Sequence, residues 1–144
     1  MCGICGFIGY KNVGLLKNMT ARLTHRGPDG EGYFFSEDIG LGHRRLAIID
    51  LSGGAQPVFN EDKTIAVISN SEIYNYKELR QELIDKGHIF RSESDTEVIP
   101  HAYEEKGVDF VKDLTGMFAI AIWDIKTKEL ILVNSFIMGD SMVQ

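Results

Sequence analysis

The sequence has no long apolar run, no basic cluster and only two cysteines, and each absence excludes a class of protein. Without an apolar run of about 20 residues, no segment is expected to cross a membrane as a helix. The N-terminus carries neither a positive stretch nor a full apolar core, so we do not interpret it as a signal peptide. The net charge of −6, without a basic cluster, argues against nucleic acid and membrane surfaces as partners. We therefore expect a cytoplasmic protein.

Internal repeats, low-complexity segments and linker-like stretches are also missing. The 144 residues are 44% hydrophobic and 25% charged, which is typical of one globular domain. A chain of this length can bury roughly 68–70% of the surface that its unfolded state exposes. The sequence therefore predicts one domain with a substantial core.

The two cysteines, Cys2 and Cys5, form a C-x-x-C pair, but a zinc site of this type needs a second ligand pair that the sequence does not show. Residues three apart on a strand face opposite sides, which also argues against a disulfide. Cys5 is interpreted as a small buried apolar residue. His25 and His43 are expected to be hydrogen-bonding residues, so no metal is assigned.

Cys2 follows the initiator methionine directly. Removal of Met1 would leave Cys2 with a thiol and a free α-amine, which titrates near neutral pH and can act as a base beside a nucleophile. The alternative is that Cys2 has no chemical role and belongs to a frayed, disordered N-terminus. The apolar, β-like run over residues 3–10 favours a Cys2 that is anchored in a sheet.

Hydrophobic spacing predicts strands at both ends of the chain and helices between them. Asn75 is expected to cap one helix, and Ser94 with Glu97 to form a capping box for another. Residues 52–57 are expected to form a mobile loop and residues 134–144 to be loose. This order predicts an α+β fold of antiparallel sheet and helix layers. The expected helices are 11–23, 76–86, 94–106 and 108–114, and the strands 3–10, 33–35, 39–43, 46–50, 64–69, 89–91, 117–123 and 130–133.

Four polar residues supply what an amide hydrolase with an N-terminal cysteine needs. Arg44 and Arg45 follow a predicted strand, and arginine is the fork-shaped donor for a carboxylate. Asn70 stands where a buried strand is expected to stop, so its amide can stabilise an oxyanion. Asp95 lies near a helix N-terminus, where negative charge is favoured. Each residue also has a purely structural interpretation. Arg44 and Arg45 could be a solvated charge pair, Asn70 a turn residue and Asp95 an ordinary capping residue.

Seven motifs occur in a fixed order along the chain. They are CGICG at 2–6, HRGPDG at 25–30, HRRLAIID at 43–50, GAQP at 54–57, NSEIYN at 70–75, SDTE at 94–97 and GMFA at 116–119. This series closely resembles the class II glutamine amidotransferase domain of glutamine-hydrolysing asparagine synthetases, over residues 2–133.

The resemblance implies an N-terminal nucleophile hydrolase fold, with layers in the order α-β-β-α and antiparallel sheets. It also implies that Cys2 is the nucleophile, with its own α-amine as the base. Asn70 and the backbone N–H of Ser71 would form the oxyanion hole. The reaction would be attack on a carboxamide, release of ammonia and hydrolysis of the thioester to glutamate.

Three further residues take substrate-binding roles by the same resemblance. Arg45 would clamp the α-carboxylate of L-glutamine, Asp95 would bind its α-ammonium, and Glu72 would line the same pocket. The loop 52–57 would belong to the lid region. The glutaminase half-reaction would need no cofactor, whereas ATP and Mg²⁺ would be needed only in a synthetase domain.

The chain departs from the family's pattern in two places. Ser71 stands where the family usually has glycine, so strain or crowding there is expected to impair activity. After Val133 the sequence diverges, so we expect a glutaminase domain over 2–133, incomplete at its C-terminus, and a divergent tail over 134–144. A synthetase domain is expected to be absent, which leaves a truncated product, a fragment or a separate subunit as alternatives.

Two other functions remain open from the sequence. The first is a catalytically weak glutamine-binding or regulatory module, motivated by Ser71 and the divergent end. The second is a thiol hydrolase in which His25 or His43 serves as the base for Cys2. Blocking the α-amine would distinguish this last mechanism, because activity would then survive.

Overall fold

Eight strands and three α-helices form the described part of the chain, which is residues 2–47, 54–135 and 141–143 of a computed structural model. The helices are α1 (Val13–Arg22), α2 (Tyr76–Asp85) and α3 (Val98–Lys106), with 3₁₀ helices η1 (Asp95–Glu97) and η2 (Gly107–Asp113). The strands are β1 (Gly3–Ile8), β2 (Gly30–Phe35), β3 (Ile39–Arg45), β4 (Val58–Phe59), β5 (Ile65–Ile73), β6 (Gly116–Asp124), β7 (Glu129–Ser135) and β8 (Ser141–Val143).

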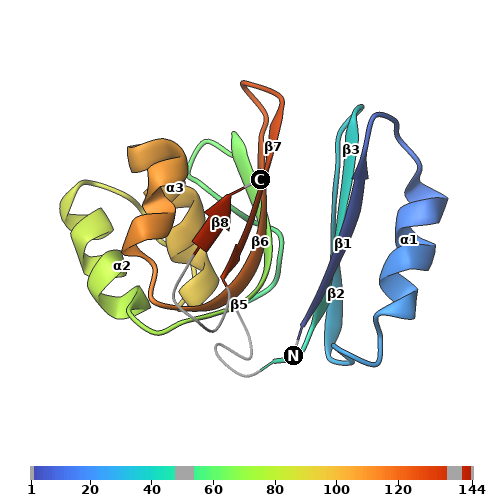
Figure 1. The fold of residues 1–144 in the computed structure, drawn as a ribbon, viewed down its shortest axis with the longest axis horizontal. Helices are drawn as coiled ribbons and strands as arrows, with labels where there is room; N and C mark the ends of the chain where they lie inside the picture. Colours follow the sequence, from blue (N-terminus) through green and yellow to red (C-terminus); the bar gives the residue numbers. More distant parts are fainter. Residues whose placement is uncertain (1, 48–53, 136–140, 144) are drawn as a thin grey trace.

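The strands form two antiparallel sheets, one in the order β1-β3-β2 and one in the order β4-β5-β6-β7-β8. Figure 1 shows the two sheets side by side, with α1 outside the first sheet and α2 and α3 outside the second. This is the α-β-β-α layering that the family resemblance implied. No helix of the described ranges is long and apolar enough to span a bilayer.

Alternation along β5 divides the hydrophobic core into two layers. Successive side chains of a strand point to opposite faces. Val67 and Ile73 accordingly join the core cluster that packs under α2 and α3. Ala66 and Ile68 join a smaller cluster with Ile39 and Leu41 of the first sheet. Even-numbered residues of β5 therefore face the first sheet, and odd-numbered residues face the helices.

Helix α1 packs closely on β3 because β3 has glycine at the contact. A Cβ on Gly42 would lie 2.2 Å from Thr20 Oγ1, which excludes any larger residue without a shift of the helix. Thr20 is fully buried, and its hydroxyl lies 3.3 Å from Cys5 Sγ. Cys5 therefore faces α1, on the opposite side of β1 from Cys2, as the strand alternation predicted.

Two of the predicted helix caps are wrong in detail. Asn75 precedes α2, but its amide bridges a distant segment: Nδ2 donates to Asp113 O (2.8 Å), and Oδ1 accepts from Thr115 N (2.9 Å). Ser94 does cap η1, where its hydroxyl accepts from Thr96 N. The carboxylate of Glu97 does not complete a capping box. It accepts from the backbone N–H groups of residues 91 and 92, each at 2.7 Å.

The predicted strands are wrong at three places. Residues 89–91 are not a strand, because Ile89 N donates to Glu61 Oε1 and Arg91 N donates to Glu97 Oε1. Of the strand expected at 46–50, residues 46 and 47 have no regular structure and 48–50 lie outside the described residues. Strand β5 does not stop near residue 69, since pairing with β6 continues as far as Ile73 opposite Gly116.

The end of the chain is more ordered than predicted. Residues 134 and 135 continue β7, and residues 141–143 form β8, which pairs with it. Residues 136–140 and 144 lie outside the described residues, as do residues 52 and 53 of the predicted mobile loop. The expectation of a loose tail is therefore wrong for the described part of 134–144.

Candidate active site

A cavity of about 350 Å³ opens where β1, β3, β5 and η1 meet, a size typical of small-molecule sites. The six site residues expected from the sequence all line it. They are Cys2, Arg45, Asn70, Ser71, Glu72 and Asp95. Residues from four distant segments therefore converge on one pocket.

Cys2 directly precedes β1 and is held beside the end of β3. Gly3 pairs with Arg44, which sets the N-terminus beside the end of β3. Leu46 N donates to Cys2 Sγ at 3.3 Å, and the sulfur lies 3.6 Å from Leu46 O. The alternative of a frayed terminus is wrong, because the pairing of the next residue, Gly3, and these sulfur contacts hold Cys2 in place.

The loop 25–30 holds this arrangement from the outside. Arg26 Nε donates to Cys2 O at 3.1 Å. Asp29 N donates to Arg45 O, and Asp29 Oδ2 accepts from Ala47 N, each at 2.9 Å. The motif at 25–30 therefore positions both the cysteine and the segment that carries Arg45.

The two arginines at the end of β3 have different surroundings. Arg44 faces the α1 side, where Nη1 pairs with Glu31 Oε2 at 2.8 Å and Nε donates to Gly27 O at 3.0 Å. Arg45 lies on the opposite face of the strand and lines the cavity. Arg44 is therefore structural, whereas Arg45 lies on the side of β3 that lines the cavity.

Asn70 faces the first sheet. It is an even-numbered residue of β5, and Ala66 and Ile68 on the same face pack against that sheet. Cys2 shares a face of the first sheet with Ile4, which packs against the same core cluster. Asn70 and Cys2 therefore project from facing sheets towards the same cavity.

The backbone N–H of Ser71 points to the edge of β5 that borders the cavity. On either side of it, Ser69 N donates to Gln56 Oε1 (2.6 Å) and Ile73 N donates to Asp95 Oδ2 (2.9 Å). Alternate N–H groups of a strand point to the same edge. The Ser71 N–H therefore points between Gln56 and Asp95, towards the cavity that both residues line.

The side chain of Ser71 causes no backbone strain. Among the described residues the non-glycine positions with positive φ are Lys63 and Lys128, so Ser71 needs no glycine conformation. Its Oγ lies 2.8 Å from Ser69 Oγ, on the helix-facing side of β5. The expected strain at Ser71 is wrong, and it gives no support to a weak glutamine-binding module.

Asp95 is a buried carboxylate in the lining of the cavity. It is 6% exposed and is held by Ile73 N. Burial raises the pKa of Asp95, and the nearby charge of Glu72 adds to the effect. An ammonium group in the cavity would offset both costs, so the site favours a cationic ligand group next to Asp95.

The two candidate histidine bases do not fit that role. His43 lines the cavity but is almost fully buried, and burial together with the charge of Arg45 lowers its pKa to about 4. His25 is exposed, and its Nδ1 lies 3.0 Å from Arg22 O. The contacts of Cys2 Sγ described above involve Leu46, so the structure does not support a histidine-activated thiol.

Sequence reasoning missed a second polar cluster in the helical layer. Glu61, His88, His101 and Glu104 bring one ligand-type atom each to within 4.8 Å of one another. They come from three separate segments, so no short motif revealed them. The spacing of His101 and Glu104 on one helix face was the only available signal.

Comparison with protein families places the chain among glutamine amidotransferases. The glutamine amidotransferase domain family matches residues 1–137. Asparagine synthetase [glutamine-hydrolyzing] 2 of Bacillus subtilis (strain 168) is 46% identical over 141 residues, which is 93% of this chain and 19% of that protein. Asparagine synthetase [glutamine-hydrolyzing] 3 of Arabidopsis thaliana is 48% identical over 142 residues, 95% of this chain and 24% of that protein. The chain thus spans about a quarter or less of these relatives.

Solved structures share the fold. The glutamine phosphoribosylpyrophosphate amidotransferase of B. subtilis aligns with 99% of this chain and 41% of its own, at a TM-score of 0.74 and 19% identity. A structure described as the allosteric regulatory enzyme of purine biosynthesis aligns at a TM-score of 0.75 and 22% identity, over the same shares. The predicted N-terminal nucleophile hydrolase fold is confirmed.

Proposed function

Because the chain belongs to the glutamine amidotransferase domain family, we propose that it hydrolyses glutamine to glutamate and ammonia in the Cys2 cavity. The observation that carries this proposal is the convergence of Cys2, Arg45, Asn70 and Asp95 on one small cavity. These residues supply a nucleophile, a carboxylate clamp, an amide donor and a partner for an ammonium group.

Arg45 and Asp95 both line the cavity, and they would bind the two charged groups on the α-carbon of glutamine together. The guanidinium of Arg45 binds the α-carboxylate of glutamine, for which its planar fork is suited. The buried carboxylate of Asp95 binds the α-ammonium, and Glu72 adds negative charge on the same side. The side-chain carboxamide is then directed to Cys2.

The reaction proceeds in two steps. The Cys2 thiol gives its proton to the α-amine freed by removal of Met1, and the sulfur attacks the carboxamide carbon. Asn70 and the Ser71 N–H bind the oxyanion. The C–N bond breaks, ammonia leaves with the transferred proton, and a thioester remains. Water then adds to the thioester carbon, the C–S bond breaks, and glutamate and the thiol are released. This half-reaction needs no cofactor.

Our proposal also includes an acceptor for the released ammonia. The relatives are named as asparagine synthetases, and the chain spans only 19–24% of the two compared. We propose that the ammonia passes to a synthetase domain or subunit, where ATP and Mg²⁺ would be required. The division into a glutaminase domain over 2–133 and a tail over 134–144, and the location in the cytoplasm, remain predictions.

The direct test is release of ammonia and glutamate by the protein with Met1 removed. Equal amounts of both products are expected. Cys2→Ala should abolish release, whereas the matched control Cys5→Ala, whose sulfur faces α1, should retain it. Retained release by Cys2→Ala, or protein whose Met1 is demonstrably removed but which releases no ammonia, would contradict the proposal.

A further inference from the structure

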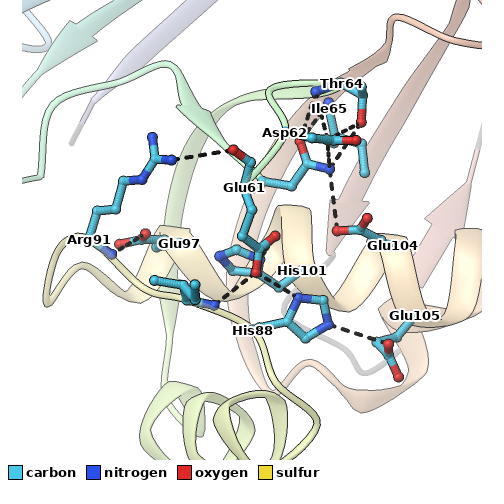
Figure 2. Close-up of polar contacts among 12 residues, drawn as sticks. Glu61, Asp62, Thr64, Ile65, His88, Arg91, Glu97, His101, Glu104 and Glu105 are labelled. Atoms are coloured by element: carbon cyan, nitrogen blue, oxygen red, sulfur yellow. Dashed lines mark hydrogen bonds and ion pairs between the residues drawn. The ribbon is translucent and has the colours of Figure 1, made fainter.

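A second site lies outside the cavity, in the layer of α2 and α3. Glu61 precedes β5, His88 follows α2, and His101 and Glu104 lie on α3. We call these four residues the His–Glu cluster. Figure 2 shows the carboxylate of Glu61 between the rings of His88 and His101, with Glu104 on the same helix as His101. Three segments distant in sequence therefore meet at one group of metal-ligand atoms.

His101 is the buried centre of the cluster and lacks hydrogen bonds. Its exposure is 0%, and neither ring nitrogen bonds to any residue that the structure describes. Nδ1 lies 3.3 Å from Glu61 Oε2, within ion-pair range only. The ring also contacts Phe90 and His88, with centroids 4.5 and 5.0 Å away. Unpaired buried polar atoms are rare and point to a missing partner.

The donor types of the cluster suit a cation. Ile89 N donates to Glu61 Oε1 at 2.8 Å and fixes that carboxylate beside the two imidazole rings. Neutral imidazole and ionised carboxylate are the forms in which these groups bind metal.

The outer contacts of the cluster also have the arrangement found around metal ligands. His88 Nδ1 lies 3.1 Å from Glu61 Oε1, and His88 Nε2 lies 3.3 Å from Glu105 Oε1. A histidine that binds metal through one nitrogen usually donates the other N–H to a carboxylate. Glu105 occupies that outer position, and Ile89 N fixes Glu61.

We propose that the His–Glu cluster is a structural binding site for a divalent transition metal, with Zn²⁺ as the best match. Two imidazoles and two carboxylates suit Zn²⁺, whereas Ca²⁺ and Mg²⁺ prefer oxygen ligands throughout. Zinc bonds of about 2.0–2.1 Å place tetrahedral ligand atoms roughly 3.3 Å apart. The two oxygens of Glu61 already have comparable separations: Oε1 lies 3.1 Å from His88 Nδ1, and Oε2 lies 3.3 Å from His101 Nδ1.

Glu104 is the ligand that must move for the site to close. The widest separation among the four atoms is 4.8 Å. The Glu104 side chain is exposed, and its contact is Asn60 Nδ2 at 3.3 Å, so a rotation can bring it inward. Closure would join the loop before β5 to the segment after α2 and to α3. This would stiffen the helix that begins directly after Asp95–Glu97.

The test is a titration of the full chain with Zn²⁺ after dialysis against a chelator, followed by calorimetry and by melting curves. One Zn²⁺ per chain and a higher melting temperature are expected. Co²⁺ should give tetrahedral d–d absorption without a thiolate charge-transfer band, which separates this site from Cys2. Absence of stoichiometric binding, or binding that disappears in Cys2→Ser, would overturn the proposal.

Matched variants locate the ion. Glu104→Gln changes an exposed side chain, so it should fold normally while weakening Zn²⁺ binding at least tenfold. Glu105→Gln should weaken it by about 10–100-fold, as for other outer partners. His101→Leu should abolish it, whereas His25→Ala and Glu129→Gln, far from the cluster, should bind as the parent does. Unchanged Zn²⁺ affinity in Glu104→Gln and Glu105→Gln would refute the site even if His101→Leu fails to fold.

Discussion

The Cys2 cavity and the His–Glu cluster use similar residue types in opposite ways. In the cavity, polar groups from facing sheets surround about 350 Å³ of space and point at that space. In the cluster, the side chains point at one another, with ligand atoms within 4.8 Å. The first arrangement leaves room for an organic molecule, and the second leaves room only for an ion.

Each region also contains one buried histidine, and their settings differ. His43 lies beside Arg45, so positive charge and burial both keep its ring neutral. His101 lies beside Glu61, so only burial and the neighbouring His88 oppose a positive charge there, and carboxylates favour one. A cation therefore fits next to His101 but not next to His43.

The largest expected effect is the loss of glutamine turnover when Cys2, in the cavity, is replaced. Cys2→Ala should lower glutamine turnover by roughly 10⁴-fold or more, as for loss of other nucleophiles. The melting temperature should stay close to that of the parent, because Cys2 is only half-buried. Zn²⁺ affinity should not change. Loss of Zn²⁺ binding in Cys2→Ala would place the ion at Cys2 and contradict the His–Glu cluster as its site.

Loss of the oxyanion donor should have the next largest effect. Asn70→Ala should reduce kcat by about 10²–10³-fold with little change in KM, because in the proposed mechanism the amide acts on the transition state. Steady-state kinetics on the processed protein would measure both. A change confined to KM would assign Asn70 to substrate binding instead.

The substrate clamps should change KM. Arg45→Ala and Asp95→Asn should each raise KM by about 10–100-fold, the range for hydrogen bonds to charged groups. Arg44→Ala is the matched control and should leave KM near the parent value. An equal increase in KM for Arg44→Ala would contradict the separate roles of the two arginines.

Asp95→Asn should also separate function from stability. The pKa of Asp95 is raised in the folded state, so its ionised form at neutral pH destabilises the fold. An amide retains an acceptor for Ile73 N without the buried charge. The melting temperature should therefore stay the same or rise while glutamine binding is weakened. A clear fall in melting temperature would show that the charge itself supports the fold.

The pH dependence of stability should reflect the buried histidines. The pKa of His43 is about 4 in the folded state and about 6.5 when unfolded, so the unfolded chain binds protons first. Stability should be intact above pH 6.5 and decrease as pH falls towards 4, by up to about 1.4 kcal/mol per pH unit for one such group. Denaturant curves would measure this, and His43→Gln should flatten the slope. Zn²⁺ should steepen it, because protonation of His101 would release the ion.

The smallest expected effect is at Ser71. Because Ser71 lacks a positive φ, Ser71→Gly relieves no strain and should change turnover by less than about threefold, or roughly 0.65 kcal/mol. The same turnover assay on Asn70→Ala gives the large decrease with which the small change in Ser71→Gly is compared. A gain of tenfold or more would show that the hydroxyl crowds the cavity.

Six residues of the cavity could be named from the sequence because its short motifs, taken together, resemble those of a known family. Strand alternation also correctly placed Cys2 and Cys5 on opposite faces of β1. The helices were predicted to within a few residues, since their apolar spacing and terminal glycines are local signals. All of these signals depend on residues that are close together in the sequence.

The misses depend on contacts between distant segments. Strand β5 continues to Ile73 because β6 pairs with it, which no local pattern records. Residues 89–91 resemble a strand, but carboxylates of Glu61 and Glu97 take their N–H groups. The His–Glu cluster needs three segments at once. Such features follow from the tertiary arrangement and not from local propensity.

The most direct test of the central claim is an intact mass spectrum after incubation with an electrophilic glutamine analogue. The account predicts a chain without Met1 that carries one adduct, mapped to Cys2 and blocked by excess glutamine. Arg45→Ala and Asp95→Asn should slow the labelling, and Glu104→Gln should not. A processed chain that remains unlabelled, or an adduct on Cys5, would contradict the assignment of the cavity as a glutamine site.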